Sequence, residues 1–274
     1  MKKSILSALI LAATLIVGGG QAQAAEGDVH AHQQSWSFAG VFGTYDRNQL
    51  QRGFQVYREA CASCHGLDFI AFRNLGEPGG PEYSEAAVRA LAATFTIEDP
   101  DAEGGSREAV PADRWPSPFE SEQIARDSNG GAYPPDLSLM AKARGIHQEF
   151  PWWVFNYFTA YQEGGADYIY NVLTRYAEPP EGVELQPGQY YNEFYPGHLI
   201  AMPPPLSDGL VAYDGEGTPE TVEQYAYDLT AFLMWTADPH LASRKQMGFR
   251  VLIFLFVFAG LMYLVKRKIW RDAH

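Results

Sequence analysis

Hydrophobic residues recur at helical spacing early in the chain, between residues 47 and 60. Leu50, Phe54 and Tyr57 are separated by three or four positions, which places them on one face of an α-helix. Asp46 stands directly before this stretch and is a residue type that commonly caps helix N-termini. The pattern predicts an amphipathic helix that begins after Asp46 and packs one face into a core.

A second stretch of the same kind lies near the end of the polar part of the chain. Thr218 and Pro219 form a typical N-cap and first-turn proline, which predicts that a helix begins there. The apolar stripe that follows consists of Val222, Tyr225, Leu229, Phe232 and Leu233. We therefore expect a mainly α-helical domain in which an early and a late helix pack together.

The chain begins with an apolar run of different meaning. Lys2 and Lys3 precede the run from Ile5 to Val17, and the small-residue sequence Ala22-Gln23-Ala24 follows it. This order is typical of a secretory signal peptide, so residues 1–24 are predicted to be removed after export. A permanent membrane helix is the alternative, and the shortness of the run and its cleavage-like end disfavour it.

The other apolar run is continuous for 15 residues from Val251 to Val265, and counting back across Arg250 to Met247 extends it to 19 residues, 247–265. Nineteen helical residues measure about 28 Å, close to the ~30 Å hydrocarbon layer of a bilayer. Residues 266–274 follow with four basic side chains, which is typical of a segment that stays in the cytoplasm. A buried core helix is the alternative interpretation.

The predicted segments define an organisation. Residues 25–243 form an exported domain, residues 247–265 a transmembrane anchor, and residues 266–274 a cytoplasmic tail. Basic residues flank both ends of the anchor, so the signal peptide decides the orientation. We expect a single-pass protein of the bacterial inner membrane, with its domain in the periplasm.

Charge changes the picture of the exported domain. The whole chain has 20 basic and 33 acidic residues and a formal net charge of −13. Residues 25–243 contain 11 of the basic and 32 of the acidic residues, a net charge of −21. A field of one sign and this size repels nucleic acid and accelerates encounters with a basic partner.

The only two cysteines of the chain lie in the sequence CASCH at residues 61–65. A Cys-x-x-Cys pair in an exported protein can form a disulfide, a redox dithiol, half of a zinc site or the attachment point of a c-type haem. Zinc needs four ligands, and no second cysteine pair is present. Haem attachment uses all three residues, because Cys61 and Cys64 each form a thioether and His65 binds the iron.

The second axial ligand of the iron decides the chemistry. A methionine or a second histidine gives a closed, electron-transferring haem, whereas an open position favours ligand binding or peroxidase chemistry. Met140 has the surroundings of a helical core residue, whereas Met202 stands in the proline-rich loop HLIAMPPPL. His198, four residues earlier, is the competing candidate.

Gly53, Tyr57 and Cys61 follow the spacing of the class I cytochrome c fold, and residues 228–233 resemble its C-terminal helix. Most of the exported part of the chain resembles cytochrome c1, the haem subunit of the cytochrome bc1 complex, a quinol:cytochrome c oxidoreductase. The motifs that resemble this family are CASCHGLDFIAFR at 61–73, NGGAYPPDLS at 129–138, EPPEGV at 178–183, YYNEFYPGHLIAMPPPL at 190–206 and RKQMG at 244–248.

The resemblance implies roles for individual residues. It implies one covalent haem c, attached through Cys61 and Cys64, with His65 and Met202 as the axial ligands. Arg144 matches an arginine that pairs with a haem propionate, a suitable task for a guanidinium group. The positions that match the lining of the haem crevice are Asn129, Pro134, Pro135, Tyr168, Tyr195 and Ile200.

The resemblance also implies partners. The chain is expected to take electrons from the Rieske iron–sulfur subunit beside cytochrome b and to reduce a soluble or membrane-anchored cytochrome c. It carries out no substrate chemistry of its own. The alternative is a membrane-anchored cytochrome c that shuttles electrons outside the bc1 complex.

One segment departs from the family pattern. Residues 146–167, IHQEFPWWVFNYFTAYQEGGAD, are longer and more aromatic than the corresponding family segment. We expect a helix and loop that cover the core, and the alternative is contact with the membrane or a neighbouring subunit.

Overall fold

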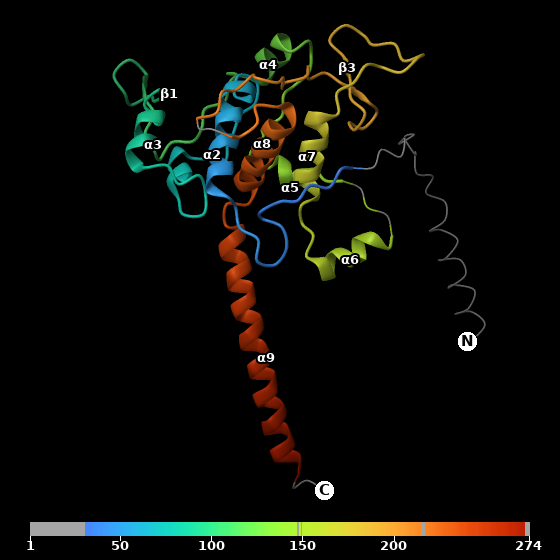
Figure 1. Cartoon of the computed structure of the whole chain (residues 1–274). Helices are drawn as coiled ribbons and strands as arrows, with labels where there is room; N and C mark the ends of the chain where they lie inside the picture. Colours follow the sequence, from blue (N-terminus) through green and yellow to red (C-terminus); the bar gives the residue numbers. More distant parts are fainter. Residues whose placement is uncertain (1–30, 147, 149, 215–216, 272–274) are drawn as a thin grey trace, which may run out of the picture. The chain divides into compact units, whose positions relative to one another are not determined.

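Helices form most of the regular structure in a computed structural model that describes residues 31–146, 148, 150–214 and 217–271. The helices are α2 (Arg47–Val56), α3 (Glu85–Ala92), α4 (Glu122–Ser128), α5 (Met140–Ala143), α6 (Trp152–Thr159), α7 (Gly164–Thr174), α8 (Val222–Ala237) and α9 (Leu241–Arg271), with a 3-10 turn at Phe72–Gly76 (Figure 1). Two antiparallel pairs complete it, β1 (Thr96–Glu98) with β2 (Ser106–Glu108) and β3 (Tyr190–Tyr191) with β4 (Leu199–Ile200). The prediction of a mainly α-helical chain with one long apolar C-terminal helix is confirmed.

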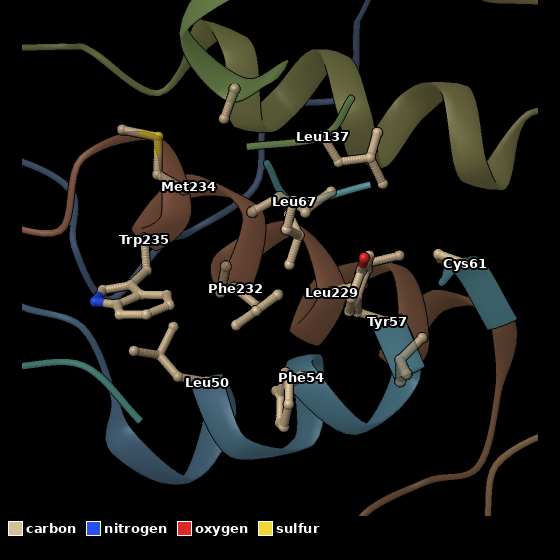
Figure 2. Packing of buried hydrophobic residues seen from close by; sticks show 14 of the residues in the cluster. Leu50, Phe54, Tyr57, Cys61, Leu67, Leu137, Leu229, Phe232, Met234 and Trp235 are labelled. Carbon is tan, nitrogen blue, oxygen red and sulfur yellow. The ribbon is translucent and has the colours of Figure 1, made fainter. Parts of the chain in front are cut away.

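The core of the domain lies where α2 and α8 pack against each other, with α7 on another side of α8. Leu50 and Phe54 of α2 face Phe232 and Leu229 of α8 (Figure 2). The rings of Phe54 and Phe232 are 5.4 Å apart. The two predicted amphipathic helices therefore do pack on each other and bury their apolar stripes.

Helix α2 begins as the sequence predicts. The Asp46 carboxylate accepts a hydrogen bond of 2.7 Å from the Gln49 amide, which satisfies one of the unpaired N–H groups of the first turn. Helix α8, by contrast, begins at Val222 with Thr221 as its N-cap, so the predicted start at Thr218 and Pro219 is wrong. Glu220 explains the difference.

Two contacts of Glu220 keep the chain before Thr221 out of the helix. Its carbonyl oxygen accepts from the Gly209 amide at 2.9 Å, and its carboxylate accepts from the Tyr213 amide at 3.1 Å. These bonds tie residue 220 to the preceding loop. The second threonine, Thr221, then caps the helix through its side chain.

Gly53 allows α2 and α8 to approach closely. A Cβ atom at this position would lie 2.1 Å from the carbonyl oxygen of Asp228 on α8 and 2.7 Å from the Cβ of Phe232. Contacts of this kind are forbidden, and the first one involves backbone, which cannot rotate away. Only glycine permits this crossing distance.

Replacing Gly53 with alanine is expected to separate the two core helices. Overpacking a core typically costs about 1–3 kcal/mol, and we expect about 3 kcal/mol here because backbone must move. Urea denaturation of the full chain in detergent, followed by circular dichroism, measures the loss. Gly248→Ala is the matched control, because a Cβ there would meet no atom within 4 Å. Equal stability of the two variants would contradict the close crossing.

Helix α9 is long and apolar enough to cross a membrane. Its most apolar residues are not buried against any other part of the described chain. It contains the whole predicted anchor, residues 247–265. The predicted signal peptide, residues 1–24, lies outside the described residues, as does the last part of the predicted tail.

The segment at 146–167 only partly covers the core. Ala166 and Asp167, at the start of α7, are buried. Helix α6, however, exposes its large side chains, with Phe158 81% and Trp152 66% exposed. The core-covering interpretation is therefore wrong for α6, because its large aromatic side chains stay exposed and do not pack against the hydrophobic core of the domain.

Candidate haem-attachment site

The CASCH sequence forms a compact turn at the end of the first core helix. Helix α2 continues into a short π-helix, Tyr57–Cys61, in which the Ala62 amide donates to the Tyr57 carbonyl at 2.8 Å. The Cys64 and His65 amides both donate to the Cys61 carbonyl, at 3.1 and 2.9 Å. Such π-turns often occur at functional sites, and this one brings both cysteines and the histidine into one turn.

Both cysteines are free thiols with different surroundings. Cys61 is buried at the end of the α2 stripe (Figure 2), whereas Cys64 is half-buried. Burial raises the pKa of the Cys61 thiol to about 12, with a smaller contribution from Cys64, so this thiol is protonated at neutral pH. The pair lies side by side in one turn, available for covalent attachment.

The imidazole of His65 is held in a single orientation. Its Nδ1 lies 2.7 Å from the carbonyl oxygen of Pro135. A carbonyl only accepts hydrogen bonds, so Nδ1 carries the proton and the Nε2 lone pair is available for a metal. Burial lowers the pKa of His65, against opposing effects of the Pro135 bond and Asp136, and this favours the neutral form that a ligand needs.

The loop that carries Pro134 and Pro135 is bonded directly to the segment after His65. The Leu137 amide donates to the Gly66 carbonyl at 3.0 Å, and the Asp68 amide donates to the Asp136 carboxylate at 2.8 Å. A cavity of about 240 Å³ lies beside this contact, and its walls include Cys64, Gly66, Tyr133 and Pro134. The structure thus brings two of the predicted crevice residues, Pro134 and Pro135, to the motif.

Asp136 is a residue that the sequence analysis did not single out. Its carboxylate accepts from the amides of Asp68 and Ser138, and its charge acts on His65. The only sequence feature that could have indicated a role for Asp136 is its position directly after Pro134 and Pro135. Tyr57 was predicted only as part of the apolar stripe, but its hydroxyl also donates to the His65 carbonyl at 2.8 Å and so supports the turn.

Met202 lies half-buried against the same hydrophobic core that contains Cys61. The Tyr176 hydroxyl donates to the Met202 carbonyl at 3.1 Å, and Ile200, two residues earlier, is buried and paired with Tyr190. The β3–β4 hairpin therefore fixes the backbone that carries the thioether. Tyr176 was not predicted, since a hydroxyl that contacts a distant carbonyl leaves no local pattern.

The competing ligand, His198, contacts its own hairpin. Its ring stacks on Tyr191 at 5.7 Å between centroids, and its Nδ1 lies 3.3 Å from the Asn192 carbonyl. The backbone at His198 is left-handed, with φ of 60°. These contacts hold the imidazole against the hairpin, whereas the Met202 side chain contacts the core.

Arg144, Tyr168 and Tyr195 form the remaining predicted group. Burial raises the pKa of Tyr168, the charge of Arg144 lowers it, and Tyr195 adds a further increase, so the three side chains lie within electrostatic range. Arg144 itself is exposed at the end of α5. Asn129 caps the end of α4, where its side-chain amide donates to the Ala125 carbonyl at 2.7 Å.

Among the residues that the structure describes, no cluster of three or more His, Cys, Asp or Glu side chains could hold a metal ion. The described residues therefore give no support to the interpretation of the cysteine pair as part of a zinc site. Two adjacent thiols and one oriented imidazole fit a haem that is attached covalently and bound through Nε2.

A family comparison decides between these interpretations. The model of the Cytochrome C1 family matches residues 36–273, nearly the whole described chain. The chain belongs to the cytochrome c1 family. Membership of the cytochrome c1 family implies a covalently bound haem c, which the free thiols of Cys61 and Cys64 and the oriented His65 can accommodate.

Individual relatives are similar to this chain over nearly all of its own length. The chain is 46% identical to cytochrome c1 of Blastochloris viridis over 99% of this chain and 97% of that protein. It is 42% identical to cytochrome c1 of Rhodospirillum rubrum over 99% of each. It is 54% identical to the cytochrome b/c1 protein of Bradyrhizobium diazoefficiens over 99% of this chain, which spans 40% of that longer protein. These bacterial cytochrome c1 relatives and the apolar helix α9 fit a membrane-anchored protein.

Proposed function

We propose that the chain is the haem-bearing electron-transfer subunit of a cytochrome bc1 complex, which accepts electrons from a Rieske iron–sulfur protein and reduces a c-type cytochrome. The observation that carries this proposal is the Cys61–His65 turn, with two free thiols and a fixed imidazole, in a chain of the cytochrome c1 family. When bound, haem c supplies a one-electron iron couple. The residues of the chain determine the position of the haem and which redox partners can approach it.

Each group of the site has a proposed task. Cys61 and Cys64 attach the haem, and His65 binds the iron while Pro135 holds its proton on Nδ1. Met202 is the proposed second ligand, because its backbone is fixed by Tyr176 and its side chain packs against the core. Both positions of the iron are then closed, which favours electron transfer over ligand chemistry.

The remaining predicted residues line the crevice. Arg144 is the proposed partner of a haem propionate, because its charge acts at Tyr168, and Tyr195 lies within range of the same hydroxyl. Pro134 and Ile200 are proposed to supply apolar surface to the crevice, and Asn129, which caps α4, to position the loop before Pro134. Burial of the haem edge among such groups tunes its potential.

The proposed location follows from the two ends of the chain. Residues 1–24 would direct export, α9 would span the inner membrane through residues 247–265, and residues 266–274 would remain in the cytoplasm. The haem domain, residues 25–243, would then lie in the periplasm. That is the side from which a soluble or anchored cytochrome c can approach.

Isolation from native membranes tests the assembly. A C-terminally tagged chain, purified in mild detergent, is expected to carry haem stain and to retain a cytochrome b and a Rieske subunit. The preparation should also reduce cytochrome c with quinol. A haem-stained chain that purifies without these subunits would support the alternative, a membrane-anchored electron shuttle outside the bc1 complex.

Salt should slow the reduction of a basic cytochrome c by this protein. The domain charge of −21 attracts a basic partner, and steering of this kind raises association rates by about 10–1,000-fold at low ionic strength. Stopped-flow measurement should show the second-order rate constant fall by about tenfold or more between low and high salt. An anionic inorganic oxidant is the control, because its rate should rise with salt. A rate with the basic partner that is independent of salt would contradict steering.

A further inference from the structure

Helix α6 lies at the end of a loop whose two ends are fixed to each other (Figure 1). The Ile146 amide donates to the Gly164 carbonyl at 3.1 Å, which closes the loop. On the returning side, the Tyr161 hydroxyl donates to the buried carboxylate of Asp167 at 2.6 Å. The base of the loop is therefore part of the domain, and α6 is carried on it.

The helix and its flanks form an exposed aromatic surface without charge. Residues 150–161 contain seven aromatic residues among twelve and no Asp, Glu, Lys or Arg. Phe158 is 81% exposed and Phe150 76%, and Trp152, Trp153 and Phe155 are about half exposed or more. A contiguous apolar surface of this kind marks a contact with a partner or a membrane.

Two polar side chains of this surface are hydrogen-bonded within the loop. The Asn156 amide donates to the Gln148 side-chain oxygen at 2.5 Å. The Thr159 hydroxyl donates to the Phe155 carbonyl at 3.2 Å. Both groups can therefore leave water without losing these hydrogen bonds, which lowers the cost of burying the surface in a less polar medium.

The loop returns to the domain close to the start of α9. Glu163, four positions after α6 ends, is close enough to Lys245 of α9 for their charges to interact. Four residues span at most about 14 Å, so the C-terminal end of α6 lies within about this distance of Glu163. One helical turn further along α9, Phe249 contacts the 76%-exposed Phe42 at 5.5 Å between ring centroids.

We propose that α6 inserts into the interfacial layer of the membrane that α9 spans, as a second contact of the domain with lipid. This inference rests on the proposed anchoring by α9. Trp and Tyr rings favour the headgroup level of a bilayer, and α6 carries such rings near the start of the span. Because residues 150–161 carry no acidic side chain, this segment avoids the repulsion that the rest of the acidic domain would meet at a negatively charged lipid surface.

Fluorescence quenching in lipid nanodiscs tests the contact on the full, haem-loaded chain. A fluorophore is attached to a single introduced cysteine, in Phe158→Cys on α6, in Leu261→Cys on α9, or in Glu103→Cys on the exposed loop between β1 and β2. Lipid brominated near the headgroup probes contact with the membrane, and iodide probes contact with water. The parent chain, whose cysteines hold haem, measures background labelling.

If α6 contacts the membrane, brominated lipid should quench the label at Phe158 several-fold more than the label at Glu103. Iodide should quench the label at Phe158 several-fold less than the label at Glu103. Strong iodide quenching at Phe158, with lipid quenching at Leu261, would overturn the α6 contact and leave the anchor intact. Protection of Phe158 from both quenchers would also overturn it, because a protein surface would then cover the helix. Absence of lipid quenching at Leu261 would refute the anchoring itself.

Discussion

Replacing Met202 with leucine is expected to remove the far-red absorption band of the oxidised protein and to lower its midpoint potential. The band reports sulfur bound to ferric iron, and loss of a thioether ligand shifts the potential by the order of 100 mV within the ~0.8 V range set by axial ligands. Leucine has nearly the volume of methionine, so the loop should keep its packing. The Tyr176 hydroxyl donates to the backbone carbonyl of residue 202, which the substitution does not remove.

Met140→Leu is the matched control for this experiment. Met140 is also half-buried and packs against the same core, but it stands on α5. Its replacement should leave both the band and the potential unchanged. If Met202→Leu keeps the parent spectrum while the band disappears in Met140→Leu, or if the parent protein shows no such band, the ligand has been assigned to the wrong residue.

Replacing both cysteines with serine is expected to abolish covalent haem. Cys61 and Cys64 are the only thiols of the chain, and serine cannot form the thioether bond. Haem staining after denaturing electrophoresis should detect nothing in the double variant. Each single variant should keep one bond and stain more weakly than the parent chain.

The double variant also separates attachment from folding. Serine differs from cysteine by one atom, but Cys61 is buried, so a hydroxyl there loses part of the favourable burial. Immunoblotting of the membrane fraction therefore accompanies the stain. A stained band of normal size in the double variant would place the covalent bond elsewhere and contradict the attachment site.

Local patterns predicted the parts of the fold whose cause is local. Asp46 caps α2 through its own side chain, and the stripe at Leu50 and Phe54 is a property of one helix, so both could be read from the sequence. The CASCH spacing likewise places three residues in one turn. A position for Pro135 near the haem was expected only from family resemblance, and the contact between its carbonyl and His65 was not predicted.

Contacts between distant segments explain what the sequence could not predict. A threonine that could cap the helix stands at both 218 and 221, so the sequence alone does not fix where α8 begins. The hydrogen bonds from the Gly209 and Tyr213 amides to Glu220 decide that it begins after Thr221. The π-turn at Tyr57 is supported by its bond to His65. The prediction for α6 was wrong because aromatic residues usually indicate a core, whereas Trp152, Phe155 and Phe158 of this helix are exposed.

Methionine methyl resonances of the reduced protein test the central claim most directly, that Met202 and His65 would be the two protein ligands of the haem iron. In diamagnetic ferrous haem, an iron-bound methionine lies over the porphyrin ring, whose current shifts its methyl protons far upfield. In a chain labelled with ¹³C-methyl methionine, we predict one such resonance, lost in Met202→Leu and retained in Met140→Leu. An upfield methyl signal that survives in Met202→Leu, or no such signal in the parent protein, would contradict the account.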